Sequence, residues 1–539
     1  MNSNQNRIPI RKISILCCIL MIFIITGFSQ KNSLQVWHEK KKMGTNFVTG
    51  FDITGSEYVF PNDIHRVFFD AETNIATVQI KGRRTSGNIL QYDMNDKKIL
   101  WSKKIDYEIH ELIKCGNLLI LNEYNNAFVI DNRTGENVSK IMNYIYFANP
   151  KYNIGVAYFY IAAGEGYYTN DLMGIDLLKG NLLWKRTINR AYGWNDFFFL
   201  NDSTLLVAAS GLHTINIKNG TGWDYQAITG VKTKPNYTGA ILGALVGGLI
   251  GGAIGGLIGS AIYYIPLNYA PTLPEPEIIS FISSNTLIDS TYIYFASQEQ
   301  LAKLDVATGD IVWEYPLPKE WTSKSSIFMD DEVIYMINHG FAIKGGQRIN
   351  YGKPFIASFN KKTGEQIYLS KMKEDRELII DFKQMGNEIY LLSQYSIAKY
   401  NLETGTMTSK KTFPKEAVGE LRYFLNDRLF VSNNSGYFSS ITQNNSSNPY
   451  FYTSHGKVIA MDNTITKTTE VKDFGFRFFR YNDYNIILSN ERVFITDKDG
   501  KIVAELDVTP KAFIINGILF DKRESSFIAI DLKNTLPNN

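Results

Sequence analysis

Histidine, cysteine and acidic side chains are the groups that most often carry catalysis or hold metals, and in this 539-residue chain they are scattered. No histidines have the close spacing of a zinc site, and each is interpreted as a surface or packed residue. They are His38, His65, His110, His213, His339 and His455. No Gly-x-Ser-x-Gly nucleophile signature occurs, and no phosphate-binding loop precedes a helix pattern. The sequence therefore predicts a protein that is not an enzyme, with no catalytic residue, no cofactor and no metal site.

A different chemistry is indicated by the apolar stretch from Gly239 to Ile262, in which glycine recurs at every fourth position. The glycines are Gly239, Gly243, Gly247, Gly251, Gly255 and Gly259. In lipid, small residues at this spacing let helix backbones pack closely, whereas each glycine in a water-soluble helix costs about 1 kcal/mol. We expect a glycine zipper that inserts into a membrane and oligomerises. The alternative is a buried hairpin or cavity-filling segment of the soluble fold.

The N-terminus has the order of an export signal. Basic residues precede an apolar run at 13–25, and small residues follow it, which predicts a secretory signal peptide over residues 1–29. After cleavage only Cys115 remains, so no internal disulfide is expected. A formal net charge of +3 gives no strong basic field, and no nucleic-acid partner is predicted.

The rest of the sequence is built from a repeated strand–turn–strand unit, which predicts the fold that holds the Gly-rich stretch. A short apolar strand is followed by Asp or Asn, a turn with Thr-Gly, and a strand that often ends in Trp; the clearest copy runs from Leu304 to Trp313. Copies begin at Asp93, Asp131, Asp176, Asn216, Asp305, Asn360, Asn401, Asp462, Asp497 and Asp531. The Asp or Asn side chain is expected to cap the turn, and Gly to supply the positive φ that closes it. The Trp is expected to pack between neighbouring sheets.

The repeat resembles that of the PQQ-like (quinoprotein-type) β-propellers, whose blades carry a similar Ala-x-Asp-x-x-Thr-Gly-x-x-x-Trp signature. The resemblance implies an all-β chain with a single β-propeller of about eight four-stranded blades, to which the sequence adds a Gly-rich apolar helical insertion. The predicted organisation is a signal peptide (1–29), an N-terminal propeller part (30–229), the glycine-zipper insertion (230–276) and a C-terminal propeller part (277–539). Some quinoprotein dehydrogenases place a vicinal cysteine pair beside the cofactor. Here the adjacent cysteines, Cys17 and Cys18, lie in the predicted signal, and no acidic cluster matches a calcium site.

The insertion is also similar to the membrane segments of glycine-zipper pore-forming toxins. We therefore expect a secreted antibacterial-type pore-forming toxin, in which the propeller binds a target-cell receptor (protein or glycan) and the zipper inserts into the lipid membrane as a self-oligomer. Proteolytic activation is one route by which the zipper would be released for insertion. The alternative is a non-enzymatic envelope propeller scaffold of the outer-membrane assembly type, anchored or oligomerised through the zipper. Either protein is expected to be exported through a Sec signal, and to be secreted or associated with the outer membrane.

Overall fold

The structure is a computed structural model, and it describes most of the chain from residue 34 onward. The described residues are 34–70, 72–82, 86–106, 110–123, 126–158, 171–189, 191–192, 196–233, 278–344, 347–372, 378–393, 396–412, 421–424, 428–432, 455–460, 468–472, 476–489, 493–497, 501–509 and 512–536. These residues are almost entirely strands, which confirms the all-β prediction. Among them, no helix is long and apolar enough to cross a membrane.

Eight consecutive four-stranded antiparallel sheets, here called blades 1 to 8, form most of the described fold. Blade 1 consists of β3 (Ile64–Asp70), β4 (Ile75–Lys81), β5 (Ser86–Asp93) and β6 (Lys98–Asp106). Blade 2 consists of β7 (His110–Cys115), β8 (Leu118–Glu123), β9 (Asn126–Asp131) and β10 (Asn137–Ile141). Blade 3 consists of β11 (Ile145–Asn149), β12 (Ile154–Tyr158), β13 (Asp171–Asp176) and β14 (Leu182–Thr187). Blade 4 consists of β15 (Asp196–Phe199), β16 (Thr204–Ala209), β17 (Gly211–Asn216) and β18 (Asp224–Gln226). Blade 5 consists of β21 (Leu287–Ile288), β22 (Tyr292–Ala296), β23 (Gln300–Asp305) and β24 (Ile311–Pro316). Blade 6 consists of β25 (Ser325–Met329), β26 (Val333–Asn338), β29 (Phe355–Asn360) and β30 (Gln366–Lys371). Blade 7 consists of β31 (Ile379–Met385), β32 (Glu388–Ser393), β33 (Ser396–Asn401) and β34 (Met407–Thr412). Blade 8 consists of β35 (Leu421–Phe424), β36 (Arg428–Ser432), β37 (His455–Ala460) and β38 (Thr468–Lys472).

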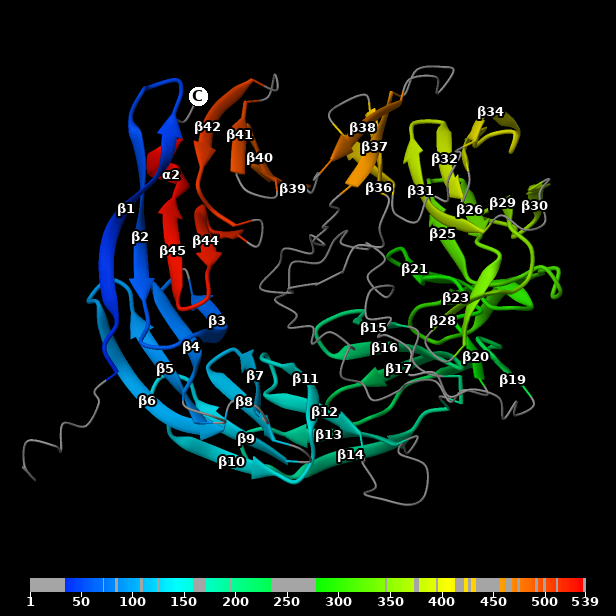
Figure 1. Ribbon diagram of the computed structural model, residues 1–539. Coiled ribbons are helices and arrows are strands. Elements are labelled where there is room, and N and C mark those ends of the chain that lie inside the picture. Colours follow the sequence, from blue (N-terminus) through cyan, green and yellow to red (C-terminus); the bar gives the residue numbers. More distant parts are fainter. Residues whose placement is uncertain are drawn as a thin grey trace, which may run out of the picture.

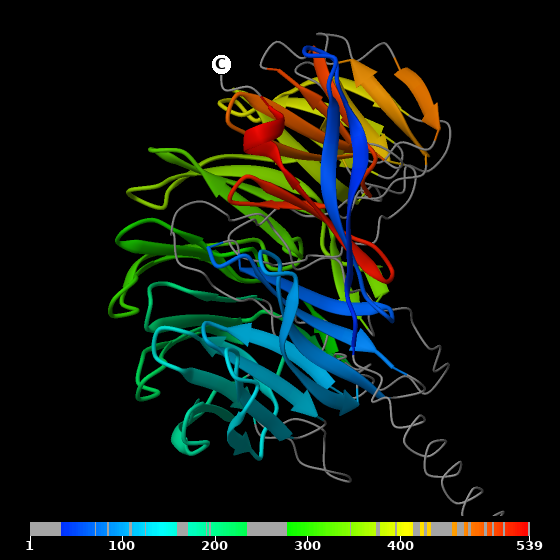
Figure 2. The ribbon, with the colours of Figure 1, turned by 90° about the vertical axis from the view of Figure 1, so that its left-hand side faces the viewer.

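The two ends of the chain meet in one nine-stranded sheet, here called the closing sheet. It joins β39 (Phe476–Tyr481), β40 (Tyr484–Ser489), β41 (Val493–Thr496) and β42 (Ile502–Leu506) to the N-terminal hairpin β1 (Trp37–Asn46) and β2 (Asp52–Val59) and to β43 (Phe513–Ile515), β44 (Ile518–Lys522) and β45 (Ser526–Asp531). The key pairing is β2 with β45, in which Ser56 opposes Ala529 and Val59 opposes Ser526. Figure 2 shows the blue N-terminal hairpin alongside the red C-terminal strands. A short helix, α2 (Leu532–Thr535), follows β45.

The sheets follow one another around a ring (Figure 1), and four-stranded meanders in this arrangement are the blades of a β-propeller. The described part of the chain forms more blade-like units than the predicted number of about eight. In the described part of the chain, the eight four-stranded blades are followed by β39–β42, and then by the sheet that β43–β45 build with the N-terminal hairpin. Each of these two additional units carries a predicted copy of the repeat, at Asp497 and at Asp531, and the last one is completed by β2 from the N-terminal end of the chain.

The repeat turns have the geometry that the sequence predicts. In the turn after β23, the Asp305 side chain accepts hydrogen bonds from the backbone nitrogens of Ala307 (2.8 Å) and Thr308 (3.0 Å). These bonds, that from Thr308 first, lower the pKa of Asp305. Gly309 follows with a φ of 76°, a conformation that side-chain-bearing residues rarely adopt. Equivalent caps are made by Asp93, Asp131, Asp176, Asn216, Asn360 and Asn401. The copy predicted at Asp462 lies outside the described residues.

The tryptophans of the repeat pack between blades, as predicted. The Trp313 Nε1 of blade 5 donates to the carbonyl oxygen of Lys361 in blade 6 at 3.3 Å. A Cβ added to Gly364 would lie 2.6 Å from the Trp313 ring, so the indole covers the turn glycine of the next blade. The same relationship joins Trp101 to Asn132, Trp184 to Ile217 and Trp223 to Val306. At these four boundaries, between blades 1 and 2, 3 and 4, 4 and 5, and 5 and 6, the blade is therefore fixed to the next by a hydrogen bond and by a ring packed on the turn glycine.

Candidate functional site

The blade topology gives the propeller two different faces. In every four-stranded meander the first and third turns lie on one face, and the middle turn and the connection to the next blade lie on the other. The first face carries the short capped turns and is called the short-turn face. The second, called the long-loop face, carries the connection from β18 to β21 and the connection from β26 to β29, the places where this chain departs most from the simple repeat.

Those two connections build one additional four-stranded sheet on the long-loop face, here called the accessory sheet. Its strands, in spatial order, are β19 (Val231–Lys232), β20 (Ile278–Ser280), β27 (Phe341–Lys344) and β28 (Gln347–Asn350). The first two come from the connection between blades 4 and 5, and the last two are a hairpin inserted in blade 6. The sheet therefore ties three consecutive blades together.

The accessory sheet holds both ends of the segment that contains the predicted zipper. In β19 and β20, Lys232 opposes Ile278 and Val231 opposes Ile279. Antiparallel partners have Cα atoms about 5 Å apart. The chain therefore leaves the propeller after residue 233 and returns at residue 278 at nearly the same point.

The pair is anchored to the propeller by a buried threonine. The Thr229 side chain is fully buried and donates to the carbonyl oxygen of Ala209 in blade 4 at 2.6 Å. The backbone carbonyl oxygen of Thr229 accepts a hydrogen bond from the backbone nitrogen of Ile282 at 3.0 Å. Ile279, Ile282 and Ala342 form a small buried core between the strands. The base of the segment is thus a packed structure and not a loose connection.

A buried histidine fixes the start of the β27–β28 hairpin to blades 6 and 7. His339 precedes β27; its Nδ1 lies 2.9 Å from the carbonyl oxygen of Ile379 in blade 7, and its Nε2 lies 2.8 Å from the Ser326 hydroxyl. Complete burial lowers the pKa of His339 to about 3. With both nitrogens in hydrogen-bonding contact and the ring neutral at physiological pH, His339 is a structural residue that joins blades 6 and 7.

The accessory sheet is basic. Its four strands contain Lys232, Lys344 and Arg348 and no acidic residue. Lys232 is exposed and Lys344 is half-buried. Arg348 retains exposed surface, but burial around its guanidinium lowers the pKa of that group. The Arg348 guanidinium carbon also lies 4.5 Å from the centre of the Phe341 ring. Such a surface is suited to contact with anionic groups.

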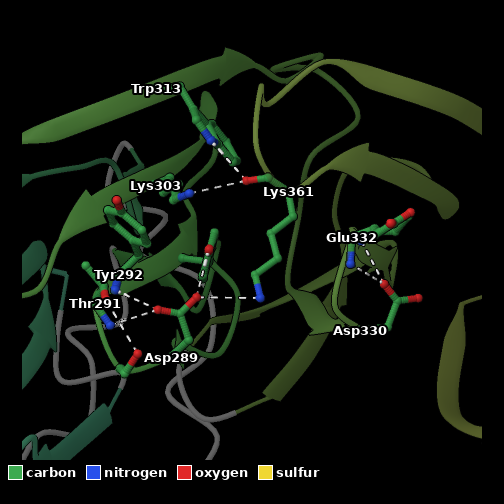
Figure 3. Close-up of polar contacts among 11 residues, drawn as sticks. Asp289, Thr291, Tyr292, Lys303, Trp313, Asp330, Glu332 and Lys361 are labelled. Atoms are coloured by element: carbon green, nitrogen blue, oxygen red, sulfur yellow. Dashed lines mark hydrogen bonds and ion pairs between the residues drawn. The ribbon is translucent and has the colours of Figure 1, made fainter.

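A cluster of polar side chains lies elsewhere, at the boundary of blades 5 and 6 on the short-turn face (Figure 3). The Lys361 ammonium lies 3.5 Å from Asp289, which also accepts from the Tyr294 hydroxyl at 3.0 Å. Burial opposes the shift, but hydrogen bonds from Thr291, Tyr292 and Tyr294 lower the pKa of Asp289. Every charged group of the cluster has a structural partner, and the carboxylates cap turns, so the cluster is assigned to blade packing.

Several features of these surfaces escaped sequence reasoning. A second series of Asp and Asn caps occupies the first turn of the blades, at Asp70, Asn149, Asn201, Asp289 and Asp330. The available signal was an Asp or Asn just before the second strand of each blade. The β27–β28 hairpin was also missed, although Gly345-Gly346 between two short alternating runs is a hairpin signal.

The predicted membrane-inserting residues lie outside the described residues, as does the predicted signal peptide. Gly239, Gly243, Gly247, Gly251, Gly255 and Gly259 all belong to the segment 234–277, so the zipper, its helical form and its role stay predictions. In the described part of the chain, no group of three or more His, Cys, Asp or Glu side chains could hold a metal ion.

Comparison with known proteins leaves the family open. No family model and no curated protein matches the sequence. Solved structures that resemble the fold include BamB from Moraxella catarrhalis, with a TM-score of 0.32 and 13% identity over 68% of this chain and 92% of that one. A eukaryotic initiation factor gives a TM-score of 0.37 and 8% identity over 86% and 97% of the two chains. A europium-containing methanol dehydrogenase gives 0.31 and 9% over 67% and 81%. Scores at this level carry no argument about the function of this chain.

Proposed function

We propose that this protein is a non-enzymatic β-propeller scaffold of the bacterial envelope, with PQQ-like repeats, that is anchored or oligomerised through its Gly-rich segment. The observation that carries the proposal is the accessory sheet, in which Lys232 and Ile278 pair at the base of the segment. A segment held in this way leaves the blades closed and free to bind partner proteins through their exposed surfaces.

The paired ends also bear on how the segment can meet a membrane. A single pass would place its ends on opposite sides of the bilayer, whereas the ends are cross-strand partners. A helical hairpin made from residues 239–262 would have arms of about 12 residues, which rise about 18 Å, less than the roughly 30 Å of a hydrocarbon core. Shallow insertion and Gly-to-Gly packing between copies therefore fit better than a span by one molecule.

Pore formation by the same segment is the second candidate, and it is favoured by the run of Gly, Ala, Val, Leu and Ile from 239 to 259. In this candidate the propeller binds a receptor on a target cell, and several copies together line a pore. The two candidates share the Gly-rich segment and differ in whether the membrane becomes permeable.

The test combines membrane fractionation, oligomer size and dye release from liposomes. The mature protein is compared with a variant lacking residues 239–262 and with a variant in which Gly243, Gly247, Gly251 and Gly255 are all changed to Leu. We expect the native protein to associate with membranes as an oligomer without releasing dye, and both variants to lose the oligomer. Dye release that needs the segment would establish the pore instead. Native protein that is monomeric and free of membranes would contradict both candidates.

A further inference from the structure

We propose that the tip of the N-terminal hairpin binds an outer β-strand of a partner protein through a Trp or Tyr side chain of that strand. The tip is the turn 46–51, which joins β1 to β2. This inference goes beyond the proposed function, because it names the place and the chemistry by which the scaffold would hold a partner. It does not depend on the Gly-rich segment.

The turn 46–51 is a further copy of the repeat turn, which sequence reasoning missed. The Asn46 side chain accepts hydrogen bonds from the backbone nitrogens of Val48 (2.9 Å) and Thr49 (3.1 Å). Gly50 follows with a φ of 74°, and its backbone nitrogen donates to the Asn46 carbonyl oxygen at 2.8 Å. The turn after β23 has the same three bonds. The tip therefore has the backbone geometry of a turn between the third and fourth strands of a blade.

Five turns of this geometry show what binds to it. In each, a Cβ added to the turn glycine would lie under 3.0 Å from an aromatic ring of the preceding blade. The N–H or O–H of that ring donates to the carbonyl oxygen of the residue that follows the cap. The pairs are Trp101 with Gly135, Trp184 with Gly220, Trp223 with Gly309, Trp313 with Gly364 and Tyr368 with Gly405. A turn of this kind thus binds an aromatic ring that carries a hydrogen-bond donor.

At the hairpin tip the same binding surface is uncovered. In the described part of the chain, no atom lies within 4 Å of a Cβ built on Gly50. No hydrogen bond among the described residues ends on the Phe47 carbonyl oxygen, the acceptor at the equivalent position. Closure of the propeller does not use this turn, because β2 supplies its own ring: the Tyr58 hydroxyl donates to the Met94 carbonyl oxygen of blade 1 at 3.4 Å.

Apolar side chains surround the uncovered glycine. Phe47, Val48 and Phe51 are 53%, 62% and 75% exposed, and residues 43–51 include no charged side chain. In the turn after β23, the position of Phe51 is occupied by Asp310. A turn that exposes three apolar side chains together is typical of a surface that a protein partner covers. The tip therefore combines an acceptor, a place for a ring and an apolar surround.

The tip is held rigidly on the short-turn face. Because β2 runs antiparallel to β45, the tip lies at the end of the closing sheet where β45 ends and α2 begins. The Asn46 Nδ2 donates to the Thr535 carbonyl oxygen at 3.1 Å, and the Phe47 backbone nitrogen donates to that of Val503 at 2.8 Å. In Figure 1 the tip is the blue turn that extends past α2. A partner strand can reach it while the Gly-rich segment leaves from the opposite face.

A partner protein fits these observations better than lipid or a second copy of the chain. A lipid tail has no donor for the Phe47 carbonyl oxygen, and the uncharged tip offers nothing to a charged headgroup. A second copy offers Trp37, since every other Trp or Tyr whose exposure the structure describes is buried or half-buried. Trp37 begins β1 at the end opposite the tip, on the face that holds the base of the Gly-rich segment.

The test is saturation-transfer-difference NMR with a peptide that represents the partner strand. The peptide copies residues 310–316, Asp-Ile-Val-Trp-Glu-Tyr-Pro, whose Trp covers a turn glycine within this chain. It is added to the mature protein, to a Gly50→Asn variant and to a Gly386→Asn control. Gly386 has a φ of 57° and no described atom within 4 Å of an added Cβ, and Asn tolerates a positive φ. A Phe47→Ser/Phe51→Ser variant removes the apolar surround and keeps the glycine. Thermal unfolding reports whether each variant is folded.

We expect the native protein and Gly386→Asn to bind the peptide equally, with saturation transferred mainly to the indole. Gly50→Asn should bind on the order of tenfold more weakly, because its side chain occupies the place of the ring. Phe47→Ser/Phe51→Ser should also weaken binding. A peptide with Phe in place of Trp should bind about fivefold more weakly, the effect of one lost hydrogen bond.

Equal binding by the native protein and Gly50→Asn would overturn the inference, as would a native protein that does not bind the peptide. Self-association that both Gly50→Asn and Trp37→Ala abolish would identify a second copy as the occupant and overturn it too. So would binding to phosphatidylcholine vesicles that Phe47→Ser/Phe51→Ser abolishes, in the absence of peptide binding. The proposed function is tested separately, because Gly50→Asn should associate with membranes and oligomerise as the native protein does.

Discussion

Trp184 donates a hydrogen bond from its indole Nε1 to the carbonyl oxygen of Ile217 at 2.6 Å, across the boundary between blades 3 and 4. Beneath the same ring lies Gly220, where an added Cβ would be 2.9 Å from the indole. The indole thus binds the turn of the next blade through a polar contact and a close approach at once. Because the relationship recurs around the propeller, the residues that define the repeat in sequence are those that join its blades.

The close approach can be tested at Gly309, whose added Cβ would be 2.5 Å from the Trp223 ring. Gly309→Ala adds both a strained positive φ and a clash, and we expect it to lower the free energy of unfolding by about 2–4 kcal/mol. Gly50→Ala is the matched control, since Gly50 has a φ of 74° and no atom within 4 Å of an added Cβ. Urea unfolding of both variants measures the difference. Equal losses would mean that the indole can move aside.

The polar contact can be tested at Tyr368, which replaces the Trp in blade 6 and donates from its hydroxyl to the carbonyl oxygen of Leu402 at 2.8 Å. Tyr368→Phe removes that donor and keeps the ring. We expect a loss of about 1 kcal/mol in the free energy of unfolding. The loss should be absent from Tyr152→Phe, since Tyr152 is half-buried in the first turn of blade 3 and its hydroxyl donates no hydrogen bond to the described residues. A neutral Tyr368→Phe variant would show that the ring contact alone joins these blades.

The turns and their tryptophans could be predicted from the sequence because their physics is local. Asp305 and Gly309 lie within one turn, and the pattern repeats often enough to identify a propeller. The closing sheet could not be predicted in this way, since its decisive pairing joins Ser56 to Ala529 across almost the whole chain. Nothing in either strand specifies that partner.

The accessory sheet escaped prediction for a different reason. Its strands are only two to four residues long, as in Val231–Lys232 and Phe341–Lys344, too short for an alternating pattern to stand out. The composition of the 239–262 stretch drew attention to the segment itself. The packed base that holds it, with Thr229 at its centre, became visible only in three dimensions.

His339 gives a pH prediction with a defined sign. Its pKa is about 3 in the folded protein, below the ordinary value of 6.5, so folding excludes a proton that the unfolded chain binds. The stabilisation is complete above pH 6.5, falls by about 1.4 kcal/mol per pH unit as the pH decreases, and is lost as the pH falls through about 3.

The measurement for His339 is urea unfolding at pH 7 and pH 5, with His339→Asn as the comparison. We expect the native protein to lose about 2 kcal/mol more than the variant between the two pH values. Burial also lowers the pKa of His213, but that residue is present in both proteins and its effect cancels. Identical pH dependence in the two proteins would show that His339 is not excluded from protonation by the fold.

The paired base of the Gly-rich segment predicts that the segment can be removed without unfolding the propeller. Because Lys232 and Ile278 are already held together, deleting residues 239–262 shortens a closed loop and should change the free energy of unfolding by only about 0.6 kcal/mol. If the segment instead fills a cavity in the soluble fold, its removal should cost several kcal/mol. Val231→Pro is the complementary variant: it puts a residue with no N–H and a fixed φ into β19 and should loosen the base while keeping the segment. Thermal unfolding and limited proteolysis of the two variants distinguish these outcomes, with an intact deletion variant and a Val231→Pro variant newly cut near the segment as the expected pair.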